Sequence, residues 1–321
     1  MSADPVRQIA DAVLYEGYVL WPYRRSALKN AQRFTFGGVY PRGWPEDRSQ
    51  MRIECLLEAE GEPRVQVAIR FLQVVRRQLY DRRRAPVDEL TVAGERHLSW
   101  EEAIEREFTV EVPGTAAIEL PADSEEEELR DEGGRPAGVI RRSWRDLHGT
   151  VEADSERLGR RLHRISVRVD NKSRWNGAAR REQVLRRTFC STHAILHAAR
   201  GAFVSLTDPP AELRQAAESC RNEGAWPVLV GADGERSTLL ASPIILEDYP
   251  QVAPESPGDL FDGAEIDQLL TLNVLALTDE EKAEMRGSDP RVRQILERAE
   301  SMSADQLMQL HGTIRDPRFP G

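Results

Sequence analysis

The sequence predicts an α+β protein, with an antiparallel β-rich body over residues 1–206 and a mixed, then α-helical, C-terminal region over residues 207–321. In the body, apolar and polar residues alternate with the period of two that is typical of strands with one buried face. In the last part, short apolar segments follow residue pairs that cap helices. A chain of 321 residues is long enough for one large body or for two abutting modules.

The N-terminal part is expected to begin with a helix and to continue as antiparallel strands. Ile9 and Val13 lie at helical spacing within residues 5–16. The alternating segments 51–57 and 65–71, separated by a short turn with glycine and proline, predict a β-hairpin.

Further strands are expected between this hairpin and residue 206. Alternation recurs in residues 108–112 and 165–169, which favours antiparallel sheet with one solvent-facing side. Residues 121–138 combine an acidic run with glycine and proline, so we expect an exposed loop there.

The C-terminal region is predicted to place helices around two short strands. Asp208 is expected to cap a helix that closes at Gly224, and residues 226–231 and 242–248 are predicted to be strands. Beyond them, three helix starts are indicated by Thr278 with Glu281, Asp289 before Pro290, and Ser303 with Gln306.

Charge, hydropathy and cysteine content limit the partners and the compartment. A net charge of −10 and a pI near 5.3 disfavour a general nucleic-acid-binding protein, which has to neutralise phosphates. No segment approaches the roughly 18 apolar residues of a transmembrane helix, so no membrane span is expected. Three widely spaced cysteines argue against a disulfide framework, and charged residues interrupt the N-terminal segment that secretion would require. We therefore expect a cytoplasmic protein.

A metal site is the most specific chemical candidate in the sequence. Cys190, His193 and His197 form a C-x-x-H-x-x-x-H pattern, and Cys220 offers a fourth ligand of the type that zinc prefers. On a helix the first three would share one face, whereas on a strand Cys190 would point away from the histidines. Packing in a core or an interface is the competing interpretation.

Catalytic motifs point to no particular reaction. The sequence contains no nucleophile elbow, P-loop or dinucleotide-binding motif. A non-catalytic protein without a cofactor is therefore the leading expectation. The alternative is a metal-dependent enzyme or metal-handling protein that uses zinc or another transition metal at the cysteine and histidine cluster.

An aromatic and basic segment, residues 15–44, is the strongest candidate for partner binding, and we call it the arm. It holds eight of the twenty aromatic residues of the chain, interleaved with basic residues. Trp, Tyr and Arg are enriched at the energetic centres of protein interfaces. Two other interpretations stay open: the arm packs across the sheet, or its basic residues contact the acidic C-terminal region of the same chain. The expected partner-binding residues are Trp21, Tyr23, Arg24, Arg25, Lys29 and Arg33.

Two blocks of the sequence carry a resemblance to a known family. They are GYVLWPYRRSALKNAQRFTFGGVYP and WPVLVGADGERSTLLASPIILEDYPQVAPESPGDLFDGAEIDQLLTLNVLALTDEEK. These blocks resemble an uncharacterised family of actinobacterial proteins associated with gene clusters for high-affinity NiFe-hydrogenases. The resemblance implies an accessory role in maturation or assembly of the hydrogenase, with hydrogenase subunits or maturation factors as protein partners. It transfers no catalytic residues.

Overall fold

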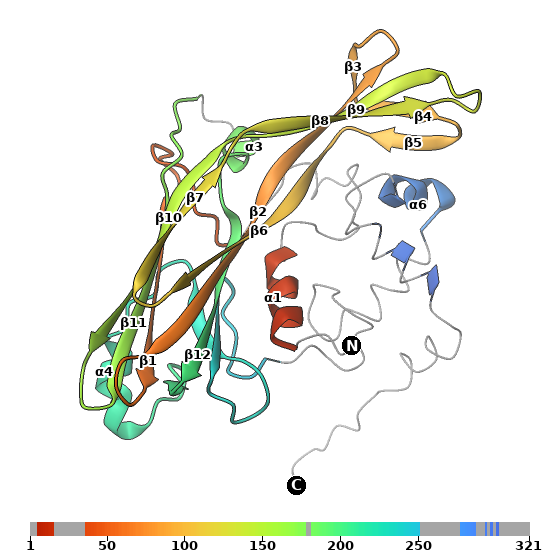
Figure 1. The fold of residues 1–321 in the computed structure, drawn as a ribbon. Coiled ribbons are helices and arrows are strands. Elements are labelled where there is room, and N and C mark those ends of the chain that lie inside the picture. The colour runs from red at the N-terminus through yellow and green to blue at the C-terminus, as the bar shows by residue number, and fades with distance from the viewer. Residues whose placement is uncertain are drawn as a thin grey trace.

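The computed structural model describes residues 5–15, 36–177, 181–250 and 277–286, together with Arg293, Leu296, Glu297, Glu300 and Ser301. Most of these residues lie in antiparallel strands, and the helices are few and short (Figure 1). The predicted α+β class with a C-terminal helical region is therefore wrong for the described part of the chain. Even after residue 207, β14 (Trp226–Leu229) and β15 (Thr238–Ser242) extend a sheet that is built mainly from earlier strands.

Two large antiparallel sheets form the body of the protein. The first has the strand order β13-β1-β11-β10-β7 and consists of β1 (Gln50–Glu58), β7 (Gly114–Leu120), β10 (Leu147–Arg157), β11 (Leu162–Asn171) and β13 (Ala202–Val204). The second has the order β14-β15-β12-β2-β9-β8, with β3 and β6 also paired to β2. Its other strands are β2 (Arg64–Asp81), β3 (Pro86–Val87), β6 (Trp100–Glu111), β8 (Asp123–Arg130), β9 (Pro136–Trp144) and β12 (Cys190–Arg200).

The long strand β2 holds the second sheet together. One of its edges pairs first with β12 and then with β9, while the opposite edge pairs with β6 and then with β3. The two sheets pack on a shared core as a sandwich. The far half of β2 continues beyond this sandwich and forms an extension with β8 and β9 (Figure 1). The hairpin of β4 (Glu89–Val92) and β5 (Glu95–Leu98) lies beside the extension. The second sheet therefore serves both the sandwich and the extension.

β1 and β2 are strands, as predicted, but the predicted hairpin between them is wrong. β1 pairs with β11 and β13, whereas β2 pairs with strands of the other sheet. The connection at residues 59–63 thus crosses from one sheet to the other. Ile53 of β1 and Val67 of β2 both belong to the hydrophobic core that lies between the two sheets. Alternation identifies the buried face of a strand but not its hydrogen-bonding partner, because strands of either sheet bury one face in the same core.

The helices lie at the periphery of the sheets. They are α1 (Pro5–Tyr15), α3 (Arg181–Leu185), the 3₁₀ turn η1 (Ala211–Leu213), α4 (Arg214–Glu218) and α6 (Asp279–Arg286). α1 confirms the predicted N-terminal helix, because Ile9 and Val13 pack against Val228 and Leu240 of the second sheet. No described helix is long and apolar enough to span a membrane.

Two helix predictions in the C-terminal region have different outcomes. The capping box at α6 is confirmed: the Thr278 N–H donates to Glu281 Oε2 at 2.9 Å, and the Glu281 N–H donates to Thr278 Oγ1 at 3.3 Å. The helix expected from Asp208 to Gly224 is much shorter, because η1 and α4 together cover only residues 211–218. The helix starts predicted at Asp289 and Ser303 lie outside the described residues.

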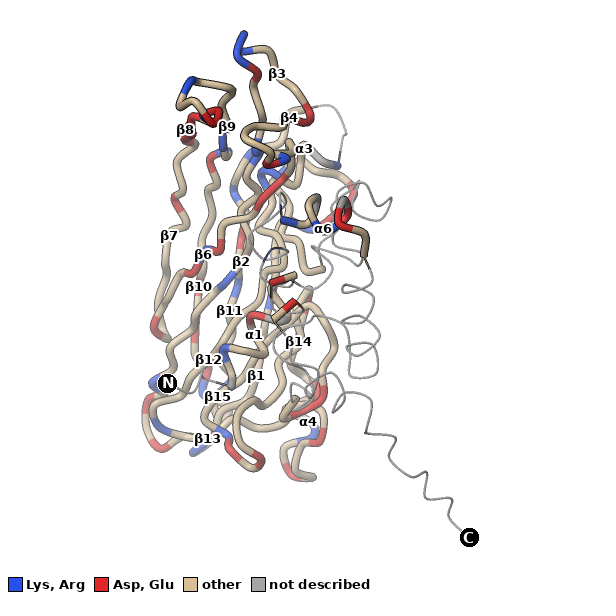
Figure 2. Tube along the Cα trace, turned by 90° about the vertical axis from the view of Figure 1, so that its right-hand side faces the viewer, with Lys and Arg blue, Asp and Glu red and all other residues tan. Residues whose placement is uncertain are grey.

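The acidic segment that was expected to be a loop is largely a strand. β8 forms one edge of the second sheet and carries an exposed run of glutamates at residues 125–128 (Figure 2). Its partner β9 places Arg142 opposite Glu125 and Arg141 opposite Glu126. Opposite charges across the two strands offset the low strand propensity of glutamate. A local sequence pattern cannot show this cross-strand pairing.

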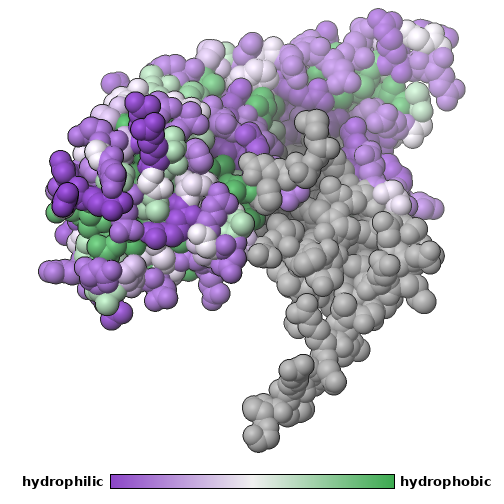
Figure 3. All heavy atoms as spheres, turned by 60° about the horizontal axis from the view of Figure 1, so that its bottom comes forward, coloured by the Kyte–Doolittle hydropathy of each residue, from purple (hydrophilic) through white to green (hydrophobic). Residues whose placement is uncertain are grey.

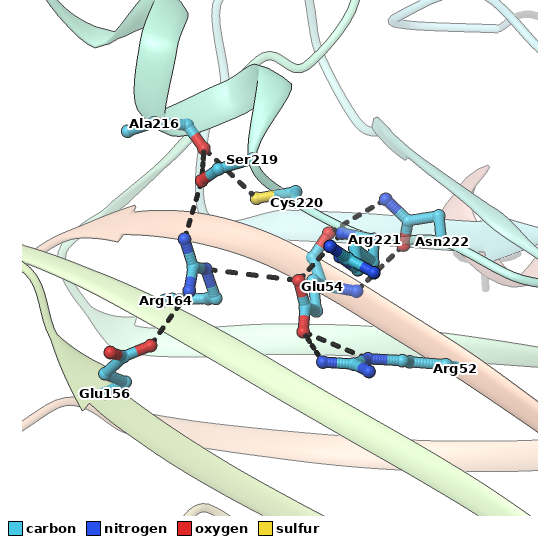
Figure 4. A network of polar contacts seen from close by, with 9 residues as sticks. All are labelled: Arg52, Glu54, Glu156, Arg164, Ala216, Ser219, Cys220, Arg221 and Asn222. Atoms are coloured by element: carbon cyan, nitrogen blue, oxygen red, sulfur yellow. Dashed lines mark hydrogen bonds and ion pairs between the residues drawn. The ribbon is translucent and has the colours of Figure 1, made fainter.

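Beyond β13, a loop covers the edge of β1. The Glu54 N–H donates to Asn222 Oδ1 at 2.8 Å, and Asn222 Nδ2 donates to the Glu54 carbonyl oxygen at 3.1 Å. The buried Glu54 carboxylate accepts hydrogen bonds from the Arg221 N–H at 2.7 Å and from Arg52 Nε at 3.0 Å (Figure 4). The loop thus satisfies a strand edge that would otherwise be open to another chain.

Candidate functional site

The predicted metal ligands do not come together. Cys190, His193 and His197 lie on the strand β12 and not on a helix, and a bulge between Cys190 and His193 interrupts the pairing with β2. Cys190 and Cys220 pack in two different apolar clusters. Within the part of the chain that the structure describes, no group of three or more His, Cys, Asp or Glu side chains is placed to hold a metal ion.

Strand geometry explains this separation. Residues four apart on a strand are roughly 13 Å apart, so the parallel side chains of His193 and His197 do not converge on one ion. His193 is fully buried, and its Nδ1 lies 3.1 Å from the Ser191 carbonyl oxygen. Burial, assisted by the positive charge of Arg70, lowers the pKa of His193 to about 3. His197 is exposed and its Nδ1 lies 3.1 Å from Thr238 Oγ1.

Cys190 is buried in an apolar cluster, and Cys220 is partly buried against another. Burial is the main cause that raises the pKa of both the Cys190 thiol and the Cys220 thiol. Both are therefore poor metal ligands and poor nucleophiles at neutral pH, since the thiolate is the reactive form.

The arm can be located only in part. The predicted partner-binding residues Trp21, Tyr23, Arg24, Arg25, Lys29 and Arg33 lie outside the described residues, whereas residues 36–44 are described. Tyr40 and Trp44 are buried and their rings stack with centroids 6.5 Å apart, as the interpretation of a structural arm predicts. Phe36 is 40% exposed and lines a pocket, as the interpretation of a docking surface predicts.

This pocket, which we call the aromatic pocket, has a volume of about 240 Å³ and joins residues from distant parts of the chain. Met51 belongs to β1 in the first sheet, Trp226 to β14 in the second sheet, and Arg181 to α3. The pocket is lined by Phe36, Gly37, Gly38, Val39, Tyr40, Asp47, Arg48, Met51, Arg181, Gly224, Trp226 and Pro243.

One wall of the aromatic pocket depends on close packing between Gly37 and Pro243. Gly37 has a φ of +63°, and a Cβ at this position would lie 2.3 Å from Pro243 Cβ. Only glycine combines this backbone conformation with such a close approach. Gly37 therefore fixes Phe36, its neighbour in the chain, beside the end of β15.

Polar groups of defined charge lie among the hydrophobic walls. Arg181 Nη2 donates to the Tyr40 hydroxyl at 3.2 Å, and burial raises the pKa of Tyr40 to about 12, so this phenol stays neutral. Arg48 is exposed next to Gly224 and forms no ion pair with any described carboxylate. The described lining thus contains two guanidinium groups and the carboxylate of Asp47.

Exposed hydrophobic side chains gather at this pocket. In the described part of the chain, four large hydrophobic residues are exposed: Phe36, Leu158, Trp226 and Ile245. Phe36 and Trp226 line the aromatic pocket, and Ile245 follows its Pro243 by two residues. The described surface that faces the viewer in Figure 3 is mainly hydrophilic, with hydrophobic residues in small patches. Such a concentration marks a binding site, whereas single exposed hydrophobic residues do not.

The described lining of the aromatic pocket combines aromatic, aliphatic and charged side chains. Among the described residues, this lining contains no His, Cys, Ser or Lys side chain, and Asp47 and Tyr40 are its carboxylate and phenol groups. Sequence reasoning directed partner binding to the arm but missed Arg48, Arg181 and Trp226. These residues come from separate segments, and only folding brings them to the end of the arm.

Comparison with known proteins identified no relative: no family model matches the chain, and no curated protein matches it.

Proposed function

We propose that this chain is a non-catalytic accessory protein that docks other polypeptides, and that it serves the maturation or assembly of a NiFe-hydrogenase. The docking role rests on one observation, the gathering of exposed Phe36 and Trp226 around a pocket that also presents Arg48 and Arg181. The hydrogenase partner is supported by the resemblance of residues 17–41 and 226–282 to proteins associated with hydrogenase gene clusters.

The aromatic pocket suits one kind of partner segment. Its aromatic walls would bury an apolar side chain, and the exposed guanidinium group of Arg48 would pair with a carboxylate next to that side chain. Trp and Arg are the residue types whose truncation most often weakens an interface. The partner segment that we propose therefore carries an apolar residue beside an acidic one.

A cytoplasmic location forms part of the proposal. Cys55, Cys190 and Cys220 are all free thiols, and the first two are buried. A reducing compartment keeps such thiols unmodified.

Co-purification from the native host tests this function. The tagged full chain should retrieve a hydrogenase subunit or a hydrogenase maturation factor. Trp226→Ala should weaken the affinity for that partner by about thirtyfold, because truncation of a hot-spot residue costs about 2 kcal/mol of binding free energy, and less partner should be recovered. Leu158→Ala is the matched control, because Leu158 is similarly exposed, at 36% against 39% for Trp226, but does not line the pocket.

Two results would contradict the proposal. If the wild-type chain retrieves no hydrogenase protein, the hydrogenase role fails. If the two variants retrieve the partner equally well while both keep the wild-type melting temperature, the aromatic pocket is not the docking site.

A further inference from the structure

A second pocket, on the extension of the second sheet, has a different chemistry. Its volume is about 410 Å³, and β2, β8 and β9 form its floor. Arg76 of β2, Arg141 of β9 and Arg145, which follows β9, line it together with the aromatic side chains of Tyr80 and Trp144. We call this pocket the arginine groove.

Strand register sets the spacing of Arg76 and Arg141, and Arg145 follows the end of β9. Arg76 lies directly opposite Ser143 of β9, and Arg141 lies two residues before Ser143. Diagonal neighbours of this kind are about 7–8 Å apart on an antiparallel sheet. In an extended peptide, side chains on one face repeat about every 7 Å. Arg76 and Arg141 are therefore spaced for acidic side chains at alternate positions of an extended segment.

Arg76, Arg141 and Arg145 form no ion pair within the described part of the chain, although Glu126 lies across the strands from Arg141. Arg76 Nη2 donates to the neutral amide of Gln78 at 2.8 Å, and Arg141 Nη2 donates to Ser124 Oγ at 3.4 Å. Neither they nor Arg145 form an ion pair with a described carboxylate. These three arginines are exposed and therefore available to an external anion.

Acidic residues of β8 border the groove and limit the length of that anion. Asp123 of β8 lines the groove, and Glu126, whose pKa is lowered mainly by its hydrogen bond with Arg84, lies opposite Arg141. At another part of the lining, Arg186 is already paired with Glu101 at 2.8 Å. A long polyanion such as a nucleic acid would meet the glutamates of β8, whereas a short anionic segment would not.

We propose that the arginine groove binds a short acidic segment of a polypeptide, in extended conformation, with carboxylates at alternate positions. Each carboxylate would accept hydrogen bonds from a guanidinium group, the geometry that arginine favours. Tyr80 and Trp144 would pack against the backbone and the aliphatic side-chain carbons of the segment. This site is separate from the aromatic pocket and does not depend on a hydrogenase partner.

Calorimetric titration of the full chain with the peptide acetyl-Ala-Glu-Ala-Glu-Ala-amide tests the proposal. Binding should weaken with added salt, and Arg76→Gln or Arg141→Gln should each weaken it by about tenfold, since a hydrogen bond to a charged group contributes on the order of 1.5 kcal/mol. Arg200→Gln is the matched control: Arg200 is also an exposed strand arginine without a described ion pair, but it lies opposite Arg64, away from the groove.

Further titrations identify the chemistry of the ligand. The peptide with glutamine in place of both glutamates should show no binding. The proposal is overturned if the glutamate peptide does not bind, if Arg76→Gln, Arg141→Gln and Arg200→Gln bind it equally, or if inorganic phosphate or a short oligothymidylate binds more tightly than the peptide in a manner that depends on Arg141.

Discussion

Arg70 of β2 and Asp11 of α1 form an ion pair with an Nη2–Oδ1 distance of 2.6 Å, although the arginine side chain is only 3% exposed. Glu105 and Glu107 of β6 lie 3.4 Å from the same guanidinium group. A buried charge of this kind is stable only when carboxylates surround it. The pair therefore fixes the N-terminal helix to the outer face of the second sheet.

Asp11→Asn should lower the free energy of unfolding by about 1–3 kcal/mol, because it removes the closest carboxylate from a buried guanidinium group while two others remain. Urea unfolding measures the change. The control is Glu89→Gln, which breaks the more exposed pair with Arg96 and should cost less than about 0.5 kcal/mol. Equal losses in the two variants would show that the Arg70 pair is not an anchor for α1.

His193 should make the protein sensitive to acid. Its folded-state pKa of about 3 lies below the ordinary value of 6.5, so between these pH values the unfolded chain binds a proton that the folded chain excludes. Stability should therefore fall as the pH drops below 6.5, with a slope of up to about 1.4 kcal/mol per pH unit from this residue. His193→Gln should flatten the profile of unfolding free energy against pH in this window.

His148 provides the opposite comparison. A hydrogen bond with Glu119 raises the pKa of His148, so its contribution to stability is present at low pH and is lost as the pH rises. His148→Gln should therefore remove a stabilising contribution at acid pH and flatten the profile above pH 6.5, while the slope below pH 6.5 stays that of the wild type. A profile that is unchanged in His193→Gln would contradict the burial of that imidazole.

Asn222 should protect the edge of β1. Asn222→Ala removes both side-chain hydrogen bonds to the Glu54 backbone (Figure 4), which leaves a buried N–H and a buried C=O group without these partners and should cost about 1–3 kcal/mol. Hydrogen exchange of the Glu54 amide should accelerate by about tenfold or more. The amide of Val167, in the middle of β11, is the internal reference. If the two amides keep their wild-type ratio of exchange rates, the loop does not protect the edge.

Gly37 should determine the shape of the aromatic pocket. Gly37→Ala places a Cβ within 2.3 Å of Pro243 Cβ at a φ of +63°, so it should destabilise the protein by about 2 kcal/mol or more and close the pocket. Gly61→Ala is the matched control, because Gly61 also has a positive φ, of +76°, but a Cβ there would meet no atom within 4 Å. The melting temperature of Gly61→Ala reports the cost of backbone strain alone, whereas that of Gly37→Ala reports backbone strain together with the steric overlap with Pro243. A smaller loss in Gly37→Ala than in Gly61→Ala would contradict the close contact.

Local patterns predicted individual elements well and their assembly poorly. The helix at residues 5–16 and the capping box of Thr278 with Glu281 were found because their signals lie within a few residues. The same capping signals led to a wrong fold class, because they mark where a helix begins but not how much of a region is helical. The strand β8 was missed because the arginines opposite its glutamates are 15–17 residues away, across a turn.

The candidate site was predictable only at one of its edges. The aromatic composition of the arm pointed toward Phe36 and Tyr40. Arg48, Arg181 and Trp226 carry no signal that joins them in sequence, because their proximity results from the packing of the two sheets. Conversely, the spacing of Cys190, His193 and His197 suggested a metal site only on the assumption of a helix, and the chain forms a strand there.

Site-specific cross-linking tests the docking role most directly. We would replace Phe36 with the photoreactive analogue para-benzoylphenylalanine, which preserves the aromatic ring, and illuminate cells of the native host that produce the full chain. The account predicts a cross-link from position 36 to a hydrogenase subunit or a hydrogenase maturation factor, and none from the same analogue at the exposed control position Leu158. Cross-links to that partner from position 158 alone, or from neither position, would contradict docking at the aromatic pocket.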